Sequence, residues 1–352
     1  MSSNKRYIAH NEDGICKEKS ARRENSKMQR NRTLCHPCLN QERECLPSSE
    51  PFTFVVGADT QLGILTMSKD WTVETEYSEK AVQLINAMNP KPAFVSICGD
   101  LVDMEPMMFE GKYGTSEECI KTQALQYDDF QRTWAALDPD IPLVCLCGNH
   151  DVGNTPTVES IERFTSRFGD DYLGFWCRGC YMLCLNSNTF FDSSHTVEHH
   201  RQQVEFLESR LQSARAEQAR RIFLFTHHPW FLFSEDEDET ALEGKNLIPG
   251  KLDEYIGDGY FPIGREQRRH VLDMCRSYGV DCCFAGHYHQ NLVSETSWGM
   301  PMVVTAAVCG WNTESSAKDM TKEENATPGP GLRVVLVDDA SAKGFTHRYE
   351  SV

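Results

Sequence analysis

From residue 52 onward, short apolar runs alternate with longer segments in which apolar residues recur at helical spacing. Short runs rich in β-branched and aromatic side chains are typical of buried strands, and spacings of three and four residues are typical of amphipathic helices. The predicted strands are 52–56, 93–98, 141–147, 181–185, 222–225 and 281–285, and the predicted helices are 78–89, 116–137, 158–168, 199–218 and 264–278. Four more predicted strands follow without helices between them: 291–297, 301–306, 332–337 and 344–349. Strand–helix alternation followed by a run of strands indicates an α/β sandwich.

The first 50 residues lack this pattern. They are rich in Lys, Arg, Glu, Asn and Ser and have no periodic apolar positions. This composition predicts a disordered basic N-terminal tail over 1–50 and one folded domain over 51–352. Pro47 and Pro51 enclose the boundary.

The charge balance limits the partners. The chain has 352 residues and a formal net charge of −17. Residues 1–50 contain ten basic and seven acidic side chains, so the remainder carries 25 basic and 45 acidic ones. Nucleic acids and anionic membranes need a basic face, so neither is expected as a partner. No apolar stretch has the roughly 18 residues of a membrane helix, and no signal peptide is visible, so we expect a cytoplasmic protein.

The 15 cysteines do not indicate a disulfide framework. An odd number spread through a long chain suits a reducing compartment. Those inside apolar runs are expected to be buried thiols: Cys98, Cys145, Cys147, Cys184, Cys282 and Cys283. Cys35, His36, Cys38 and Cys45 have a spacing that approaches a zinc knuckle, but no second ligand pair follows at a fitting distance. An unstructured tail is therefore favoured over a zinc site there.

Polar residues that can bind a metal ion or take part in catalysis follow five of the predicted strands. The segments are Gly57-Ala58-Asp59-Thr60-Gln61, Gly99-Asp100-Leu101-Val102-Asp103, Gly148-Asn149-His150-Asp151, Thr226-His227-His228-Pro229 and Gly286-His287-Tyr288-His289. In open α/β sheets, ligands bind beyond the carboxyl ends of the strands. A single Asp after a strand is usually a cap or turn residue, and a single His is usually structural. Five such segments in order favour a shared site, and their mixed donors suit Mn, Fe or Zn.

This ordered set resembles the calcineurin-like metallophosphoesterase superfamily over about residues 52–350, and within it the calcineurin-like phosphoesterase domain-containing serine/threonine phosphatases. Further segments similar to that group are Asn89-Pro90-Lys91-Pro92, the continuation Val152-Gly153-Asn154-Thr155-Pro156-Thr157, Gly169-Asp170-Asp171-Tyr172, Gly331-Leu332-Arg333-Val334-Val335 and His347-Arg348-Tyr349. The resemblance implies a four-layer αββα sandwich with two divalent metal ions between the sheets, their identity (Mn, Fe, Zn or Mg) left open.

The resemblance also implies roles for individual residues. Asp100 is similar to the carboxylate that bridges the two ions, and His150 to the catalytic histidine. The implied ligands of the second ion are Asn149, His227 and His287, and those of the first are Asp59 and His289, with Gln61 where the superfamily usually has histidine. A glutamine oxygen is a weaker ligand than imidazole, so the affinity of the first position is in question. His227 is preferred to His228 because the superfamily pattern is His-x-Pro.

Asp103 has two possible roles by resemblance. It either reaches the first metal ion, as in purple acid phosphatases, or holds His150, as in phosphoprotein phosphatases with Gly-Asp-x-x-Asp. The second role is favoured. Finding Asp103 on the metal and away from His150 would overturn that choice.

The implied reaction is hydrolysis of phosphate monoesters, most of all phosphoserine and phosphothreonine in proteins. Two ions about 3.5–4 Å apart supply a hydroxide for in-line attack, and His150 acts as general acid. A phosphodiesterase or nucleotide-hydrolysing enzyme remains the alternative, because Met104 stands where phosphoprotein phosphatases have arginine. A non-catalytic interaction module is the alternative of another class.

Residues 231–262 form a long connection after a ligand-bearing strand and contain the acidic run 234–239. Long connections in compact domains are often functional. The acidic run is expected to be a solvated charge run, or else a surface that favours basic substrates. Segment 106–119 is a second candidate rim of the site. Oligomeric state is left open.

Overall fold

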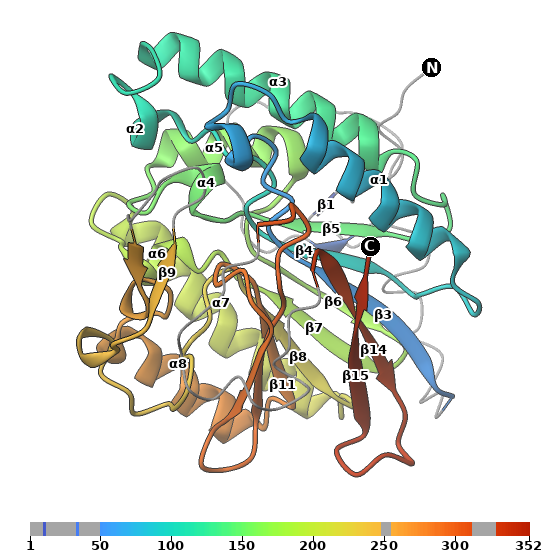
Figure 1. Cartoon of the computed structure of the whole chain (residues 1–352). Coiled ribbons are helices and arrows are strands. Elements are labelled where there is room, and N and C mark those ends of the chain that lie inside the picture. Colours follow the sequence, from blue (N-terminus) through green and yellow to red (C-terminus); the bar gives the residue numbers. More distant parts are fainter. Residues whose placement is uncertain (1–9, 12–32, 35–49, 248–254, 312–328) are drawn as a thin grey trace.

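The chain folds into two β-sheets that face each other, with helices on their outer sides (Figure 1). The computed structural model describes residues 10–11, 33–34, 50–247, 255–311 and 329–352. This arrangement is the α/β sandwich that the strand and helix pattern predicts, with the four layers that the family resemblance implies.

The first sheet has the strand order β15-β14-β3-β4-β5. The strands are β3 Phe52–Gly57, β4 Val95–Cys98, β5 Leu143–Leu146, β14 Gly331–Val337 and β15 Phe345–Ser351. β3, β4 and β5 run parallel, whereas β14 is antiparallel to both β3 and β15. The carboxyl ends of β3, β4 and β5 therefore lie at one edge of the sheet.

The second sheet has the order β12-β13-β11-β8-β7-β6. Its strands are β6 Leu173–Cys177, β7 Cys180–Cys184, β8 Ile222–Phe225, β11 Cys282–Ala285, β12 Leu292–Glu295 and β13 Pro301–Val304. β7, β8, β11 and β13 are parallel, and the two outer strands pair antiparallel to their neighbours. The carboxyl ends of β8 and β11 therefore also share one edge.

Aromatic side chains fill the space between the sheets. Phe54 on β3 is fully buried and stacks on Phe94 of its own sheet, with ring centroids 4.9 Å apart. Its ring also meets Phe223, Phe225 and Phe284 of the opposite sheet at 5.4–5.9 Å. Burial of such rings is the main source of stability in a core of this kind.

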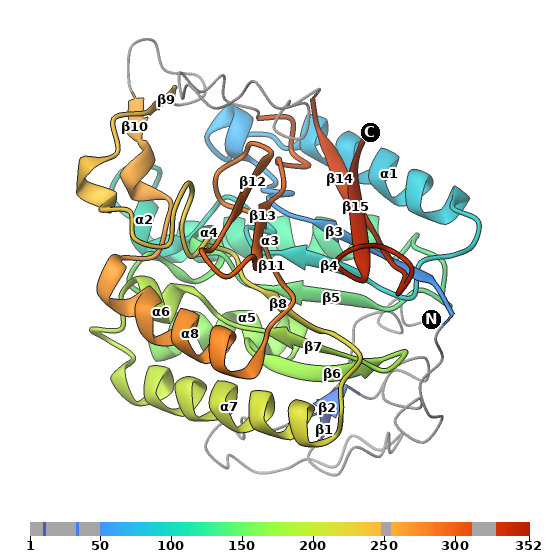
Figure 2. The ribbon, with the colours of Figure 1, turned by 90° about the horizontal axis from the view of Figure 1, so that it is seen from below.

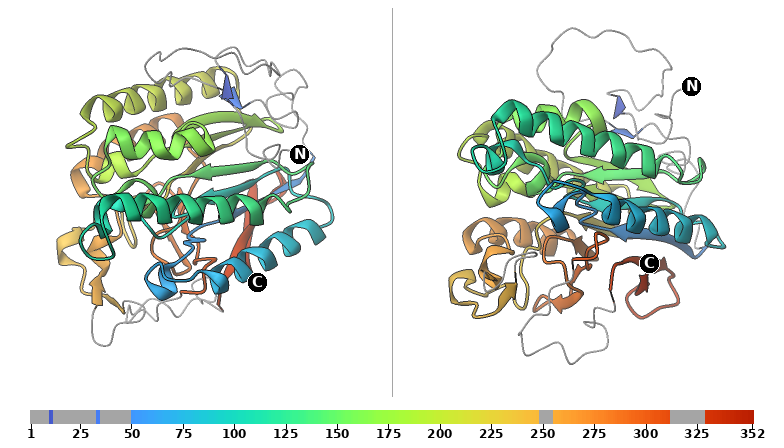
Figure 3. Two further views of the ribbon diagram at one scale, coloured as in Figure 1. Left: turned by 90° about the horizontal axis from the view of Figure 1, so that it is seen from above. Right: turned by 45° about the horizontal axis from the view of Figure 1, so that its top comes forward.

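The helices form the two outer layers. α1 Thr72–Ala87, α3 Ser116–Trp134 and α5 Val158–Phe168 pack their apolar faces on the first sheet. α7 Val197–Ala216 and α8 Arg265–Tyr278 cover the second sheet and lie side by side (Figure 2). α1 and α3 also lie next to each other (Figure 3). Within the described residues, no helix is long and apolar enough to cross a membrane.

Most predicted elements are confirmed, with ends that differ by a few residues. Helix α1 begins six residues before the prediction, and β6 was not predicted. The short helices α2 Pro106–Phe109, α4 Asn149–Val152 and α6 Asn188–Phe191 were also missed, because four residues are too few to show periodicity. The connection 231–262 contains the antiparallel pair β9 Lys245–Leu247 and β10 Tyr255–Gly257.

The N-terminal predictions remain predictions. Only β1 His10–Asn11 and β2 Thr33–Leu34 are described there, and they pair antiparallel. The disordered tail and the cluster Cys35, His36, Cys38 and Cys45 lie outside the described residues. The six cysteines assigned to apolar runs are buried free thiols, and burial raises the pKa of the Cys145 thiol well above its ordinary value.

Candidate metal centre

Six side chains from five strand ends converge between the two sheets. Asp59, Asp100 and Asn149 follow β3, β4 and β5, and His227, His287 and His289 follow β8 and β11. Two groups have ligand atoms that all lie within 4.8 Å of one another: Asp100 with His227 and His287, and Asp59 with Asp100 and His289. Asp100 belongs to both groups, which is the position a bridging carboxylate needs.

The backbone at these strand ends adopts an uncommon conformation. Five non-glycine residues have positive φ angles: Asp59 at 55°, Gln61 at 34°, Asp100 at 49°, His287 at 67° and His289 at 58°. Such residues cost energy and persist only where the surrounding structure holds them. Two main-chain bonds do so, from Asp59 N to Gly99 O at 3.0 Å and from Gln61 N to Asp100 O at 2.9 Å. The strain is concentrated where the ligands turn inward.

Glycines allow the strand ends to approach each other. A Cβ atom on Gly99 would lie 2.5 Å from His227 Nδ1, and one on Gly148 would collide with the Asp100 carboxylate. One on Gly286 would collide with Ala58 and would lie 2.5 Å from Asp59 Oδ2. These glycines are therefore needed for close packing around the ligands.

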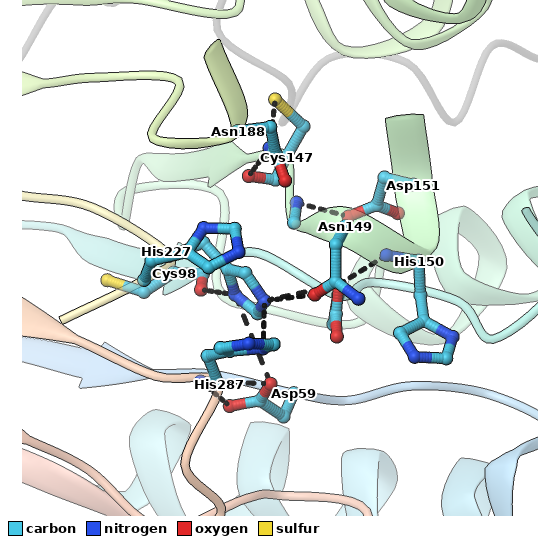
Figure 4. A network of polar contacts seen from close by, with 12 residues as sticks. Asp59, Cys98, Cys147, Asn149, His150, Asp151, Asn188, His227 and His287 are labelled. Atoms are coloured by element: carbon cyan, nitrogen blue, oxygen red, sulfur yellow. Dashed lines mark hydrogen bonds and ion pairs between the residues drawn. The ribbon is translucent and has the colours of Figure 1, made fainter. Parts of the chain in front are cut away.

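The first group of donors surrounds the Nε2 atom of His227 (Figure 4). Asn149 Oδ1 lies 3.0 Å from it, His287 Nδ1 3.1 Å and Asp100 Oδ1 3.4 Å. The opposite nitrogen, Nδ1, lies 2.8 Å from the carbonyl oxygen of Cys98 and so donates its hydrogen there. That bond leaves Nε2 as the atom available to a metal ion, as is usual for ligating histidines.

The second group is built around Asp59, which is fully buried. Its carboxylate accepts from the backbone N–H of His287 at 3.0 Å and lies 3.3 Å from His289 Nε2. His289 Nδ1 is held by the carbonyl oxygen of Trp311 at 3.1 Å, so its Nε2 faces Asp59. Gln61 is 1% exposed and lines a cavity beside the two donor groups, and its Oε1 atom has no hydrogen-bond partner among the described residues.

These residues fit a divalent cation. Two buried carboxylates and converging imidazole nitrogens need a compensating positive charge. Burial lowers the pKa of His227, but Asp100 outweighs it and raises the pKa to about 9. A metal ion would take the place of that proton. The carboxylate, amide and imidazole donors suit borderline ions, and the unpartnered Gln61 oxygen suits a neutral ligand.

His150 lies beside the donor groups and extends away from them (Figure 4). Its backbone N–H donates to Asp100 Oδ1 at 2.8 Å. Its Nδ1 atom lies 2.8 Å from the carbonyl oxygen of Asp103 and 3.2 Å from Asp103 Oδ1. Burial lowers the pKa of His150, but Asp100 and then Asp103 outweigh it and raise the pKa to about 10. Asp103 therefore lies against His150, as the favoured role requires, and that role stays a prediction.

Asp103 is itself held in place. Ser68 donates to Asp103 Oδ2 at 2.7 Å, and Gln126 donates to Ser68 at 3.1 Å. Met67 and Ser68 both have positive φ angles, of 55° and 58°, so an uncommon backbone turn positions this hydroxyl. No sequence signal pointed to Ser68.

Tyr260 is a second residue that the sequence did not single out. Its hydroxyl accepts from Asn149 Nδ2 at 3.3 Å and donates to Asn154 Oδ1 at 3.1 Å. Because the amide nitrogen of Asn149 points to Tyr260, its oxygen faces the donor group. Tyr260 belongs to the connection 231–262, whose position depends on tertiary packing that periodicity cannot reveal.

His228, the unassigned member of the His-His pair, is fully buried. Its Nδ1 atom bonds Ser187 Oγ at 2.9 Å, and its ring stacks on Phe191 with centroids 5.0 Å apart. Burial and the neighbouring His227 lower its pKa well below the ordinary value. A neutral, packed imidazole fits a supporting role.

The acidic run 234–239 serves the fold. Glu237 accepts from the backbone N–H groups of Leu232 and Phe233, each at 2.8 Å. The buried guanidinium of Arg268 bonds the carbonyl oxygens of Glu235 and Glu237. None of the run lines the cavity beside the donor groups. Ser234, Asp236 and Asp238 are exposed, as expected of a solvated run, whereas Glu237 is bonded within the fold, and none of the run is a wall of this cavity.

Comparisons with known proteins agree with this geometry. The family model for calcineurin-like phosphoesterases matches residues 52–291. The mouse protein named serine/threonine-protein phosphatase CPPED1 is 34% identical over 332 residues, covering 92% of this chain and 90% of its own. The human protein of the same name is 34% identical over 312 residues, covering 86% and 84%.

Solved structures share the fold at low identity. A purple acid phosphatase from yellow lupin seeds has a TM-score of 0.56 at 13% identity, covering 91% of this chain and 54% of its own. A dimetal phosphatase from Danio rerio has a TM-score of 0.51 at 15% identity, covering 82% and 96%. The family match and the curated relatives establish the resemblance seen in the sequence: the protein belongs to the calcineurin-like phosphoesterase family and is a hydrolase of phosphate esters.

Proposed function

We propose that the protein removes phosphate from phosphoserine and phosphothreonine in protein substrates, with His150 as general acid. The observation that carries this proposal is the position of His150, which lines the cavity between the Asp100 carboxylate and Asp103. The relatives named serine/threonine-protein phosphatase support the substrate class.

These ligands would hold two divalent ions, and such a centre would supply a hydroxide nucleophile and neutralise charge on the phosphoryl oxygens. We assign Asp59, Gln61 and His289 to one position and Asn149, His227 and His287 to the other, with Asp100 shared. The ligands orient the phosphate so that the ester oxygen faces His150.

His150 then handles the leaving group. A carbonyl oxygen only accepts hydrogen bonds, so His150 Nδ1 carries a hydrogen toward Asp103 O. Nε2 is the nitrogen left to face the cavity and to protonate the departing alkoxide. Such proton transfers contribute about 10²–10⁴-fold to the rate. Asp103 fixes the ring and stabilises its charged form.

The test is phosphatase turnover on metal-stripped protein titrated with Mn²⁺, Mg²⁺ and Zn²⁺. p-Nitrophenyl phosphate and its bis-ester are compared side by side, with His150→Asn as control. Metal-dependent cleavage of the monoester supports the phosphatase activity, and a large loss of phosphoserine-peptide cleavage in the variant supports His150 as general acid. Preference for the diester, which the apolar Met104 allows, would instead indicate a phosphodiesterase. No turnover of either ester would favour a binding module on the same fold.

The cellular setting is part of the proposal. A cytoplasmic location is supported by the buried free thiols at Cys98, Cys145 and Cys147. The expected partner is a phosphoprotein, and neither nucleic acid nor membrane. Residues 1–50 are proposed to be a tail outside the catalytic domain 51–352.

A further inference from the structure

A cavity of about 220 Å³ lies directly beside the two donor groups. The remaining lining is apolar or aromatic once its charged and polar side chains are set aside: Gln61, Asp100, Asp103, Lys112, His150, His287 and His289. Lys112 is the only basic side chain besides histidine among the described residues that line it. A cavity that served the phosphate alone would not need apolar walls of this extent.

One wall comes from segment 106–113. Phe109 is 9% exposed, and its ring centroid lies 5.1 Å from that of Tyr113 and 5.9 Å from that of His150. The segment is anchored by the buried Glu105, which caps Met108 N at 2.9 Å and pairs with Arg163 at 3.2 Å. The wall is therefore fixed next to the proton donor.

A second wall comes from the connection 231–262. The rings of Tyr260 and Phe261 each lie 5.2 Å from the ring of His287. The hydroxyl of Tyr260 is already bonded to Asn149 and Asn154, so this residue contributes its ring rather than a free hydroxyl to the cavity lining. This wall is fixed next to the donor groups.

The charged groups near the cavity do not compete with these walls. The Nζ atom of Lys112 lies 4.9 Å from the ring of Tyr113 and 5.6 Å from that of Phe109, so this cation rests against the rings of the first wall. The acidic run 234–239 does not line the cavity. The part of the substrate that carries the leaving oxygen lies at His150. Beyond His150, the first side chains that it contacts are therefore Phe109 and Tyr113.

We infer that this cavity is a specificity subsite for a large apolar or aromatic side chain adjacent to the phosphorylated residue. The inference rests on the proposed phosphatase activity and names its substrate class: phosphopeptides with apolar neighbours. Burial of one such side chain is worth about tenfold or more in kcat/KM.

The test measures kcat/KM on phosphoserine peptides that differ only at the two flanking positions, which carry Phe, Leu, Ala, Glu or Lys. We expect Phe and Leu to exceed Ala, Glu and Lys by about tenfold. Phe109→Ala should remove most of this preference, and Tyr113→Ala, at a less buried position, should reduce it. Met107→Ala is the matched control, because Met107 lies in the same helix and is 54% exposed.

Equal cleavage of all peptides, or a preference that survives in both wall variants, would overturn the subsite. A preference for Glu would overturn it too and would assign recognition to Lys112. A second assay separates this inference from the proposed function. It compares kcat/KM for 2-naphthyl phosphate with that for phenyl phosphate, because the two leaving groups have similar acidity but differ in apolar size. If no peptide is cleaved but the naphthyl ester is preferred and Phe109→Ala removes that preference, the subsite stands and the phosphoprotein proposal falls. If that preference is also absent, both fall.

Discussion

Replacing His150 gives the sharpest test of the mechanism, because two variants separate its two nitrogens. In His150→Asn the side-chain nitrogen lies near the place of Nδ1 and keeps a donor for Asp103 O, which lies 2.8 Å from Nδ1 in the native protein. In His150→Gln the amide reaches toward the place of Nε2 but does not release a proton. Both variants keep the backbone N–H that donates to Asp100. Metal binding should therefore persist in both.

The expected loss depends on the leaving group. Phosphoserine leaves as a strongly basic alkoxide, so kcat should fall about 10²–10⁴-fold, which corresponds to roughly 3–5 kcal/mol of transition-state stabilisation. p-Nitrophenolate is stable without a proton, so its loss should be about tenfold or less. Both variants should show this difference between the esters.

The assay is steady-state turnover of a phosphoserine peptide and p-nitrophenyl phosphate at saturating Mn²⁺, with the metal content of each variant measured by mass spectrometry. An equal loss on both esters, at full metal content, would refute His150 as the proton donor. Unchanged turnover of the peptide would remove it from catalysis altogether.

Three further predictions concern support for the site and the fold. Tyr260→Phe removes the hydroxyl bonded to Asn149 Nδ2, and it should weaken one metal position about 10–100-fold in calorimetric titration; unchanged affinity for both ions would contradict this. Phe54→Ala should lower the free energy of unfolding by about 3–5 kcal/mol in urea, since the ring contacts both sheets, and a loss below about 1 kcal/mol would contradict that packing. His347 accepts from Arg333 at 3.2 Å, and burial together with that cation lowers its pKa to about 4. The folded state thus keeps His347 neutral while the unfolded chain binds a proton below about pH 6.5, so stability is lost as the pH falls from 6.5 toward 4. Between pH 7.5 and 5 this loss in the free energy of unfolding is about 2 kcal/mol. With both proteins free of metal, His347→Gln should lose correspondingly less than the native protein. Equal losses in the two proteins would argue against this role of His347.

The sequence predicts the parts of this structure that repeat. Buried strands and amphipathic helices are periodic, and the turn after each parallel strand is short, so the strand-end rule selects Asp59, Asp100 and Asn149 without knowledge of the sheet order. It does not predict that Asp59 and Asp100 themselves take positive φ angles, because the glycines beside them suggest that glycine alone makes the turn. The metal and catalytic roles of these residues remain predictions.

The features that the sequence did not predict depend on contacts between distant segments. Ser68 reaches Asp103 across 35 positions, and Tyr260 reaches Asn149 across 111. The acidic run 234–239 looks solvated in the sequence because nothing local shows that Glu237 folds back onto Leu232 and Phe233. Charge and periodicity are local properties, and these contacts are set by packing.

The site also explains why two sheets are needed. Carboxylates come from the first sheet and imidazoles from the second, so the charged donors meet only when the aromatic core between the sheets closes. His227 Nδ1 bonds the carbonyl oxygen of Cys98 on β4, and His287 N bonds Asp59 after β3, so each sheet orients ligands of the other. A change in the core that shifts one sheet by a fraction of an ångström therefore acts on both donor groups at once. Stability of the core and geometry of the ligands are, for this reason, one property of the fold.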